Sequence, residues 1–415
     1  MTKDPKSFEQ VDQWKTTMFL YSSALKSINT KIEILNKNTT AAVAYIRELP
    51  EGQRPDVMWA SAPDAFEVLK AEGRLAKITP NVQGIPDKIG AYPMNDADGH
   101  YFGFAASGYG IMWNTRYLAA RGIAAPRDWR DLTRPEYFGH VVMSSPSRSS
   151  TNHLMIEAIL QGEGWREGWA QILRIAGNCG LIADRSSGVP NNVTSGRFGA
   201  GLVVDFLGLT ARYGGLPVDF TYARPSVVSV ANIALVRGAR NPAGGKRFIE
   251  FALSAAGQEL LLRPEISRLP VLASVYGGPQ LPKNYPRIKD VVERSVGDYD
   301  PDLSEMRYQV VGAIFDQLVT YRHDNLVEVS RLLHAAEKLL ASRPDRKASA
   351  LLEEARELAF RPPVGEQEAL LAHRNGNARA DIAQLAAYEA AWGQQAEANY
   401  AKARRLAEQA LARVR

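Results

Sequence analysis

The chain has 415 residues, of which 45% are hydrophobic, so it can bury a sizeable core and form two or three domains of ordinary size. Lys and Arg total 50 against 45 Asp and Glu. This small excess is spread along the chain and forms no basic stripe with interleaved aromatic residues, which is the usual signature of nucleic-acid binding. The composition therefore predicts a globular protein without a nucleic-acid partner.

The residue patterns of catalysis and metal binding are not found in this sequence. Cys179 is the single cysteine, which excludes an internal disulfide and any cysteine-rich metal site, and its GNCG turn favours a structural thiol. The six histidines show no metal-binding spacing, and the sequence has no Walker loop, no complete GxGxxG after a strand and no GxSxG elbow. We therefore expect no metal, no cofactor and no enzyme activity.

The amino-terminal residues lack the apolar segment of a signal peptide, because their apolar run, Met18 to Tyr21, is only four residues long. No later stretch approaches the about 18 to 20 continuous apolar residues of a membrane span. We therefore expect no membrane insertion and no secretion signal in the sequence as written.

From residue 31 to about residue 284, short β-branched runs alternate with helical patterns, which predicts an α/β fold. The expected strand and helix pairs are, in chain order, 31–35 with 39–49, 56–60 with 63–73, 141–145 with 153–162, and 199–206 with 207–215. Residues 101–107 and 108–114 favour antiparallel pairing, and the strand 232–237 leads into a helix over 243–261. Gly73 and Gly122 follow helical stretches and are expected to end them.

After Asp302 the strand patterns stop, and Ala, Leu, Glu and Arg dominate. Residues 326–342, 346–360 and 396–415 are predicted to form amphipathic helices, since apolar residues recur every three or four positions. Such helices need a partner surface. Two interpretations remain open, namely the body of this protein and an intermolecular helical contact.

Residues 141–153, VVMSSPSRSSTNH, predict an anion-binding loop. A β-branched run stops at Ser144, and a cluster of hydroxyls around Arg148 precedes an apolar helix. The first turn of a helix has unpaired N–H groups and the positive end of the helix dipole, to which hydroxyls and a guanidinium add further donors. A phosphate or carboxylate is the expected guest. The alternative is that Ser150 or Thr151 only caps the helix.

Polar side chains follow the ends of several predicted strands, which is where open α/β sheets bind ligands. The candidate ligand-binding residues are Asn38, Thr39, Thr40, Ser61, Ser147, Arg148, Ser149, Ser150, Thr151, Asn152, Arg185, Ser187, Gly188 and Asp205. Each alone is also typical of a cap or turn, and only their shared placement favours one binding cleft. Asp205 suits a ligand hydroxyl or orients Arg185, because a bare carboxylate repels an anion. His153 faces the ligand or completes the helix cap.

The order of these segments over residues 31–280 resembles the extracellular solute-binding proteins of bacterial transporters, in the subgroup that includes ferric-ion and phosphorylated-sugar binders. The resemblance rests on residues 55–78, 103–115, 128–153, 194–206 and 233–261. The last of these combines a strand, an Asn-Pro turn and a helix containing SxxGQ. The NKNTTAA segment at 36–42 and the long helical tail are similar to those of regulators of phosphoglycerate transport.

The resemblance implies a type II periplasmic-binding-protein fold, with two α/β lobes joined by crossing segments and closing on a ligand by hinge motion. Lobe 2 would span roughly residues 115–225, and lobe 1 the remainder of 31–302. Residues 303–415 would form a helical extension, and residues 1–30 a remodelled or truncated amino-terminal segment, because only about ten residues separate the first apolar run from Lys31. The resemblance also implies a periplasmic location.

The resemblance further implies an anionic metabolite as the ligand. Ferric-binding relatives carry paired tyrosines after the strand that corresponds to 200–204, whereas this chain has Asp205, Phe206 and Leu207. Hard ferric iron needs several phenolate or carboxylate oxygens.

We therefore expect a binding protein that captures a small phosphorylated carboxylate such as phosphoglycerate, for signalling to a membrane sensor kinase, for uptake through a permease, or for both. The alternatives are an importer component for ferric ion or another anion, an enzyme acting on phosphorylated metabolites, and a helical scaffold that binds no ligand.

Overall fold

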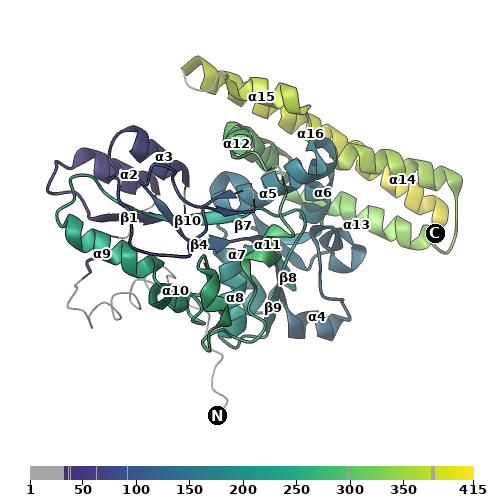
Figure 1. Ribbon diagram of the computed structural model, residues 1–415. Coiled ribbons are helices and arrows are strands. Elements are labelled where there is room, and N and C mark those ends of the chain that lie inside the picture. Colours follow the sequence, from purple (N-terminus) through teal and green to yellow (C-terminus); the bar gives the residue numbers. More distant parts are fainter. Residues whose placement is uncertain are drawn as a thin grey trace, which may run out of the picture. The chain divides into compact units, whose positions relative to one another are not determined.

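The computed structural model describes residues 32–35, 37, 39–61, 63–90, 92–297, 299–374 and 379–415. The predicted segment 1–30 and the candidate residue Asn38 lie outside this set. The chain divides into two compact units (Figure 1). Unit 1 takes in the described residues up to Gly108 together with Asp205–Leu216 and Val228–Glu293, and unit 2 comprises Tyr109–Val204, Pro217–Val227 and Arg294–Arg415.

Unit 1 is built on an antiparallel sheet with the strand order β1-β10-β4-β11. The strands are β1 (Val57–Ala60), β10 (Ser229–Leu235), β4 (Phe102–Ser107) and β11 (Leu269–Pro270). A separate two-stranded sheet is formed by β2 (Lys88–Ile89) and β3 (Tyr92–Pro93). The helices are α2 (Thr39–Glu48), α3 (Pro63–Ala71), α8 (Asp205–Tyr213), α9 (Pro242–Leu253), α10 (Ala255–Leu261) and α11 (Ile288–Val292).

Helices cover both faces of the larger sheet in unit 1. Alternate residues of β10 point to opposite faces, so consecutive residues pack against different helices. Ile233 packs with α9 and α10, whereas the next residue, Ala234, packs with α2 and α3. Phe66 of α3 and Phe104 of β4 are fully buried on these two faces. The continuous apolar run of β10 in the sequence is the consequence of burial on both sides.

Unit 2 contains a mixed sheet with the strand order β7-β6-β8-β5-β9. Its strands are β5 (Tyr109–Asn114), β6 (Val141–Ser144), β7 (Cys179–Ala183), β8 (Ala200–Val204) and β9 (Val218–Tyr222). β6 is parallel to both β7 and β8, and β5 is antiparallel to β8 and β9. The helices over this part of the chain are α4 (Thr115–Arg121), α5 (Ser150–Glu163), α6 (Trp165–Gly177), α7 (Gly188–Thr194) and the short turns η1 (Trp129–Thr133), η2 (Pro135–Tyr137) and η3 (Pro146–Arg148).

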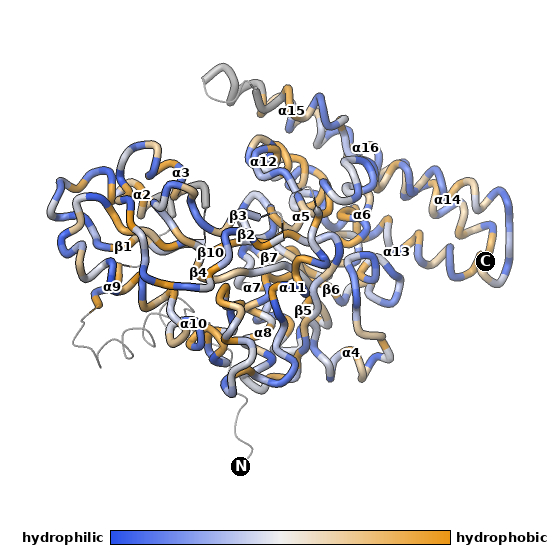
Figure 2. Tube along the Cα trace, viewed as in Figure 1, coloured by the Kyte–Doolittle hydropathy of each residue, from blue (hydrophilic) through white to orange (hydrophobic). Residues whose placement is uncertain are grey.

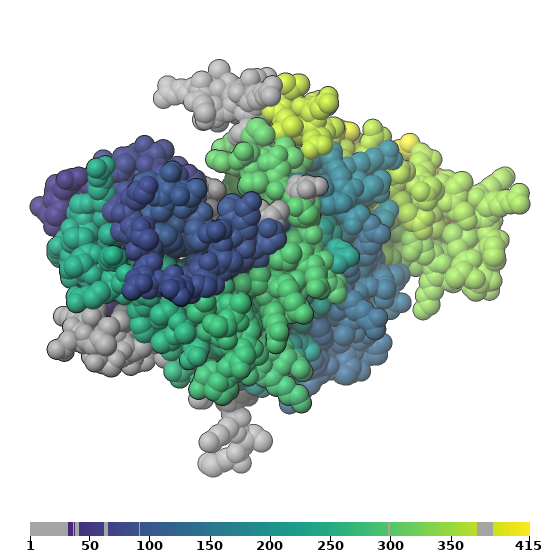
Figure 3. Space-filling view, viewed as in Figure 1, coloured from purple at the N-terminus to yellow at the C-terminus, as the bar shows by residue number. Residues whose placement is uncertain are grey.

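The carboxy-terminal helices belong to unit 2. They are α12 (Pro301–Phe315), the π-helical segment η5 (Asp316–Thr320), α13 (His323–Leu340), α14 (Arg346–Ala359), α15 (Glu366–Arg374) and α16 (Arg379–Val414). Figure 2 shows hydrophobic positions interleaved with hydrophilic ones along α13, α14 and α16. The apolar faces of these helices pack on one another, and α13 packs on α6. The green and yellow-green side chains of this segment lie directly against the blue ones of unit 2 (Figure 3).

The α/β class and the helical extension are therefore confirmed. The antiparallel pairing expected of residues 101–114 is also confirmed, with β4 next to β10 and β11 and β5 next to β8 and β9. Gly73 and Gly122 have φ values of +64° and +66°, in the left-handed region that ends helices. One predicted strand is wrong. Residues 32–35 form no strand, and Ile34 and Leu35 are exposed. A strand exists only where a neighbour pairs with it, and among the described residues the edge strand β1 pairs only with β10.

Candidate functional site

The loop between β6 and α5, Ser145–Ser150, carries the cluster of hydroxyls that the sequence predicts to bind an anion, and we call it the hydroxyl loop. Ser149 caps α5, because its backbone is extended and its side chain accepts a hydrogen bond from Asn152 N at 3.2 Å. The predicted caps, Ser150 and Thr151, instead lie in the first turn of the helix. This correction follows from geometry, since a cap reaches the backbone N–H three residues ahead.

The hydroxyl loop presents polar groups to solvent at the start of a 14-residue helix. Ser147, Arg148 and Ser150 are exposed, whereas Ser145 and Ser149 are buried. Arg148 Nη1 donates to Asp184 Oδ1 at 2.7 Å, and the Asp184 side chain is 89% exposed. Because such a surface ion pair contributes little to stability, an incoming anion can take the place of Asp184.

The segment that follows β7 lies beside the hydroxyl loop. β6 and β7 are parallel neighbours, so their carboxyl ends meet at the same edge of the sheet. Arg185 is exposed, and its carbonyl accepts a hydrogen bond from Gly188 N at 2.9 Å in the turn that starts α7. Ser187 makes no capping hydrogen bond with its side chain. The structure therefore brings Arg148, Arg185 and Ser187 to one edge of the sheet, and their role in ligand binding stays a prediction.

Two of the predicted residues turn inward. Asn152 Nδ2 donates to the Ser144 carbonyl at 2.6 Å, and its side chain also contacts Ser144 Oγ. His153 is buried, and its Nε2 lies 3.1 Å from the carbonyl of Ser304 in α12. Burial lowers the pKa of His153 to about 4, so the imidazole is neutral at pH 7. His153 is therefore not the helix cap, because that place belongs to Ser149, and its partner lies in the helical extension.

The other candidates lie in unit 1. Thr39 and Thr40 begin α2, and Ser61 is exposed directly after β1. Asp205 is 1% exposed, and its carboxylate accepts hydrogen bonds from Gly108 N at 2.8 Å and Phe206 N at 2.7 Å. These contacts tie the end of β4 to the start of α8. The roles predicted for Asp205 in ligand binding, and for Thr39, Thr40 and Ser61, stay predictions.

Residues of the helical extension, which no sequence pattern predicts to be near the site, cover the hydroxyl loop. Asp316 Oδ1 accepts hydrogen bonds from Ser145 Oγ at 2.8 Å and from Thr320 Oγ at 2.5 Å. A Cβ atom built on Gly312 would lie 3.2 Å from Ser147 Cα. No local pattern signals these contacts, because Ser145 and Asp316 are 171 positions apart.

A cluster of three potential metal ligands in the described ranges, Asp96, Asp98 and His100, does not fit a cation site. Lys70 Nζ lies 2.5 Å from Asp96 Oδ1 and 3.2 Å from Asp98 Oδ2, where a metal would have to bind. Burial alone would raise the pKa of Asp96, but hydrogen bonds from Lys70 and His100 outweigh it and the pKa falls to about 2. The Lys70 ammonium therefore already pairs with both carboxylates and takes the place of a cation.

Cys179 is buried and unpaired at the start of β7, and burial raises the pKa of its thiol, so the thiolate nucleophile is disfavoured. Across the residues described, no helix combines the length and the apolar character that a membrane span requires.

Comparisons with known proteins agree with the architecture of the two units. The sequence pattern of the family described as "Bacterial extracellular solute-binding protein" matches residues 53–287. The chain is 32% identical over 326 residues to the phosphoglycerate transport regulatory protein PgtC of Salmonella typhimurium, a match that covers 77% of this chain and 78% of PgtC.

Two solved structures show the same fold. The periplasmic binding protein AfuA from Actinobacillus pleuropneumoniae, with fructose-6-phosphate bound, has a TM-score of 0.55 and 18% identity, covering 77% of this chain and 93% of AfuA. An extracellular solute-binding protein from Bordetella parapertussis has a TM-score of 0.58 and 16% identity, covering 73% of this chain and 94% of that one. The chain therefore belongs to the bacterial extracellular solute-binding protein family and has the type II periplasmic-binding-protein fold, extended by carboxy-terminal helices.

Proposed function

We propose that this protein captures a small phosphorylated carboxylate, with phosphoglycerate as the first candidate, at the hydroxyl loop and the adjoining segment after β7. The observation that carries the proposal is the amino terminus of α5, where the side chains of Ser147, Arg148 and Ser150 are exposed together. Hydroxyls, a guanidinium and the positive end of a helix dipole together suit a phosphate. Arg185 offers a second guanidinium at the same edge.

The choice of phosphoglycerate is supported by the relative PgtC, whose name assigns it to the regulation of phosphoglycerate transport. Iron fits the described side chains less well. The segment after β8 offers Asp205 where paired phenolates would be needed, and that carboxylate already accepts two backbone hydrogen bonds.

We further propose that the loaded protein acts through a membrane partner, either a sensor or a permease. The family to which the chain belongs consists of extracellular solute-binding proteins, and delivery of a solute or of a signal requires a partner in the membrane. The helical extension supplies a large additional surface on unit 2 for such a contact.

A thermal-shift panel tests the ligand. The panel contains 3-phosphoglycerate, 2-phosphoglycerate, phosphoenolpyruvate, glycerate, hexose phosphates, inorganic phosphate and ferric citrate. A ligand at one hundred times its dissociation constant stabilises the folded protein by about 2.7 kcal/mol, so the Tm is expected to rise with the phosphoglycerates. Glycerate, which lacks the phosphate, is expected to leave the Tm unchanged. A rise with ferric citrate alone, or no rise at all, would contradict the proposal, and turnover of a phosphoglycerate would favour the enzyme alternative.

A further inference from the structure

The helical extension packs against the hydroxyl loop. Its residues lie beyond residue 287, where the match to the family pattern ends. The close approach of Gly312 to Ser147 leaves no room for a larger residue at position 312 without a shift of the loop. Four residues further on, Asp316 begins the π-helical segment η5 and reaches Ser145. π-helical turns are rare and are often found at functional sites.

The hydrogen bonds of Ser145 determine which way the hydroxyl proton of Ser147 points. Ser145 Oγ has one proton, and it donates that proton to the carboxylate of Asp316, which can only accept. In the 2.8 Å contact between Ser145 Oγ and Ser147 Oγ, the donor must therefore be Ser147. Ser147 is an exposed residue of the loop, yet its proton points back toward Asp316 and away from an incoming anion.

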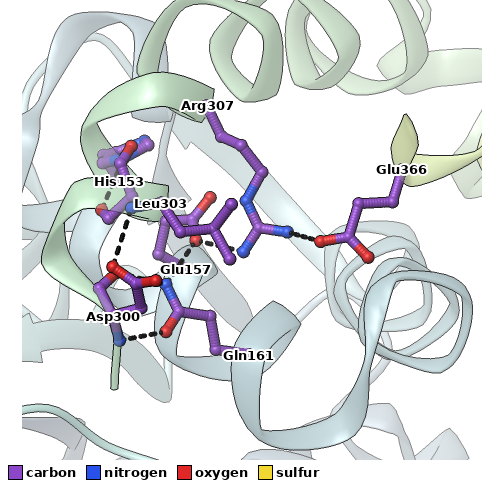
Figure 4. Close-up of polar contacts among 8 residues, drawn as sticks. His153, Glu157, Gln161, Asp300, Leu303, Arg307 and Glu366 are labelled. Atoms are coloured by element: carbon purple, nitrogen blue, oxygen red, sulfur yellow. Dashed lines mark hydrogen bonds and ion pairs between the residues drawn. The ribbon is translucent and has the colours of Figure 1, made fainter. Parts of the chain in front are cut away.

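Helix α12, which carries Gly312 and leads into Asp316, is firmly anchored on α5. Arg307 Nη2 donates to Glu157 Oε2 at 2.7 Å, and both side chains are at most 1% exposed. Arg307 Nη1 also pairs with Glu366 at 2.5 Å, as Figure 4 shows. In α5, one turn before Glu157, His153 also contacts Ser304 of α12. Asp316 is thus presented to the loop by a rigid pair of helices.

We propose that Asp316 is a positioning residue that restrains the hydroxyl loop and lowers its affinity for anions. This inference rests on the proposed function. A ligand oxygen bound to Ser147 lies no more than about 9 Å from Asp316, the length of three hydrogen bonds, where like charges still repel across one Debye length. Anion binding must also turn the Ser147 proton away from Ser145. Both effects oppose binding, so the helical extension sets the affinity of the loop.

Thermodynamic linkage gives this restraint a consequence for signalling. If contact with Asp316 weakens anion binding, then anion binding must weaken the contact of η5 with the loop by the same factor. The packed helices that follow η5 in the chain then report the occupancy of the loop to a partner. The site and the helical extension become one coupled system within unit 2.

The variant Asp316→Asn tests the inference in the full-length protein. Asparagine removes the charge and can donate to Ser145, which reverses the chain of hydroxyls and points the Ser147 proton outward. Calorimetric titration with 3-phosphoglycerate and with inorganic phosphate is expected to show binding about three- to tenfold tighter than in the wild type. Asp302→Asn is the matched control, because it makes the same charge change at an exposed residue of α12.

The titrations separate the inference from the proposed function. Tighter binding in Asp316→Asn, with Asp302→Asn unchanged, upholds the inference. Unchanged or weaker binding in Asp316→Asn, while the wild type binds phosphoglycerate, overturns the inference and leaves the proposed function standing. If Asp316→Asn binds phosphoglycerate and the wild type does not, the restraint is upheld, but phosphoglycerate is not a ligand of the wild type. No binding in either protein overturns both.

Hydrogen exchange distinguishes the proposed coupling from a purely structural role of Asp316, because a structural role would not make exchange in η5 depend on the ligand. In the wild type, saturating 3-phosphoglycerate is expected to speed amide exchange in η5, and in Asp316→Asn this acceleration is expected to disappear. Slower exchange in η5 of the ligand-bound wild type would overturn the coupling even if the affinities change as expected.

Discussion

His153 links the start of α5 to α12, and its burial makes the stability of the fold depend on pH. Its pKa is about 4 in the folded protein, compared with about 6.5 for an unperturbed histidine. The unfolded chain therefore binds more protons between these values, so stability falls as the pH falls through this window. Going from pH 7 to pH 5 is expected to cost about 2 kcal/mol through His153 alone.

Urea denaturation of the wild type and of His153→Gln at pH 7 and pH 5 checks this expectation. The variant should lose less stability on acidification than the wild type, by about 2 kcal/mol. Burial also lowers the pKa of His140 and His323, and both residues remain in the two proteins, so the difference isolates His153. An identical pH dependence in the two proteins would refute the buried, neutral state of His153.

At the residue scale, the sequence was informative where the chemistry is local. Ser147, Arg148 and Ser150 follow a strand end and precede a helix, and both features follow from patterns within about ten residues. Asp316 and Ser304 were not predicted, because their contacts with the hydroxyl loop and with α5 join residues more than 150 positions apart. Hydrophobic periodicity shows that a helix such as α13 needs a partner surface, but it does not identify that surface.

At the scale of elements, the packing of the extension on unit 2 depends on a close approach of α6 to α13. A Cβ atom on Gly177 would overlap Ser330 Oγ and lie 3.1 Å from Ser330 Cβ. The Ser330 hydroxyl is buried and is without a hydrogen-bond partner among the described residues. Gly177→Ala is therefore expected to destabilise the protein by about 1 to 3 kcal/mol through overpacking.

Chemical denaturation of two further variants checks whether the overlap is the cause. Ser330→Ala alone is expected to change stability by no more than about 0.5 kcal/mol, since the hydroxyl has no partner to lose. The double variant Gly177→Ala with Ser330→Ala is expected to recover most of the loss. A double variant as unstable as Gly177→Ala would show that the contact between α6 and α13 is not tight at this point.

The elements also show what periodicity predicts and what it does not. The run of buried β-branched residues in β6 and the three- and four-residue spacing in α13 both predicted the observed structures. The same reasoning placed a strand over residues 31–35, where the described residues form none. An apolar alternating run shows only that a segment can be a strand, whereas the hydrogen bonds that make it one come from a neighbour.

At the scale of the whole molecule, the family could be recognised from the sequence because its motifs combine several elements in a fixed order. The strand, Asn-Pro turn and helix at residues 233–261 correspond to β10, α9 and α10, with Asn241 capping α9. The sequence motifs do not identify the ligand in this way. A hydroxyl loop with Arg148 suits phosphate, sulfate or carboxylate, and the difference depends on where the remaining donors stand.

The proposed function requires that the Arg148 guanidinium in the hydroxyl loop binds the ligand's phosphate, and calorimetric titration with 3-phosphoglycerate measures this contact. Arg148→Ala is compared with Arg166→Ala, which removes another exposed arginine of unit 2 that pairs with an acid at 2.8 Å. Loss of a charge-assisted hydrogen bond predicts binding about 10- to 100-fold weaker in Arg148→Ala and wild-type affinity in Arg166→Ala. Wild-type affinity in Arg148→Ala would show that the anion binds elsewhere in the protein and would overturn the proposed site.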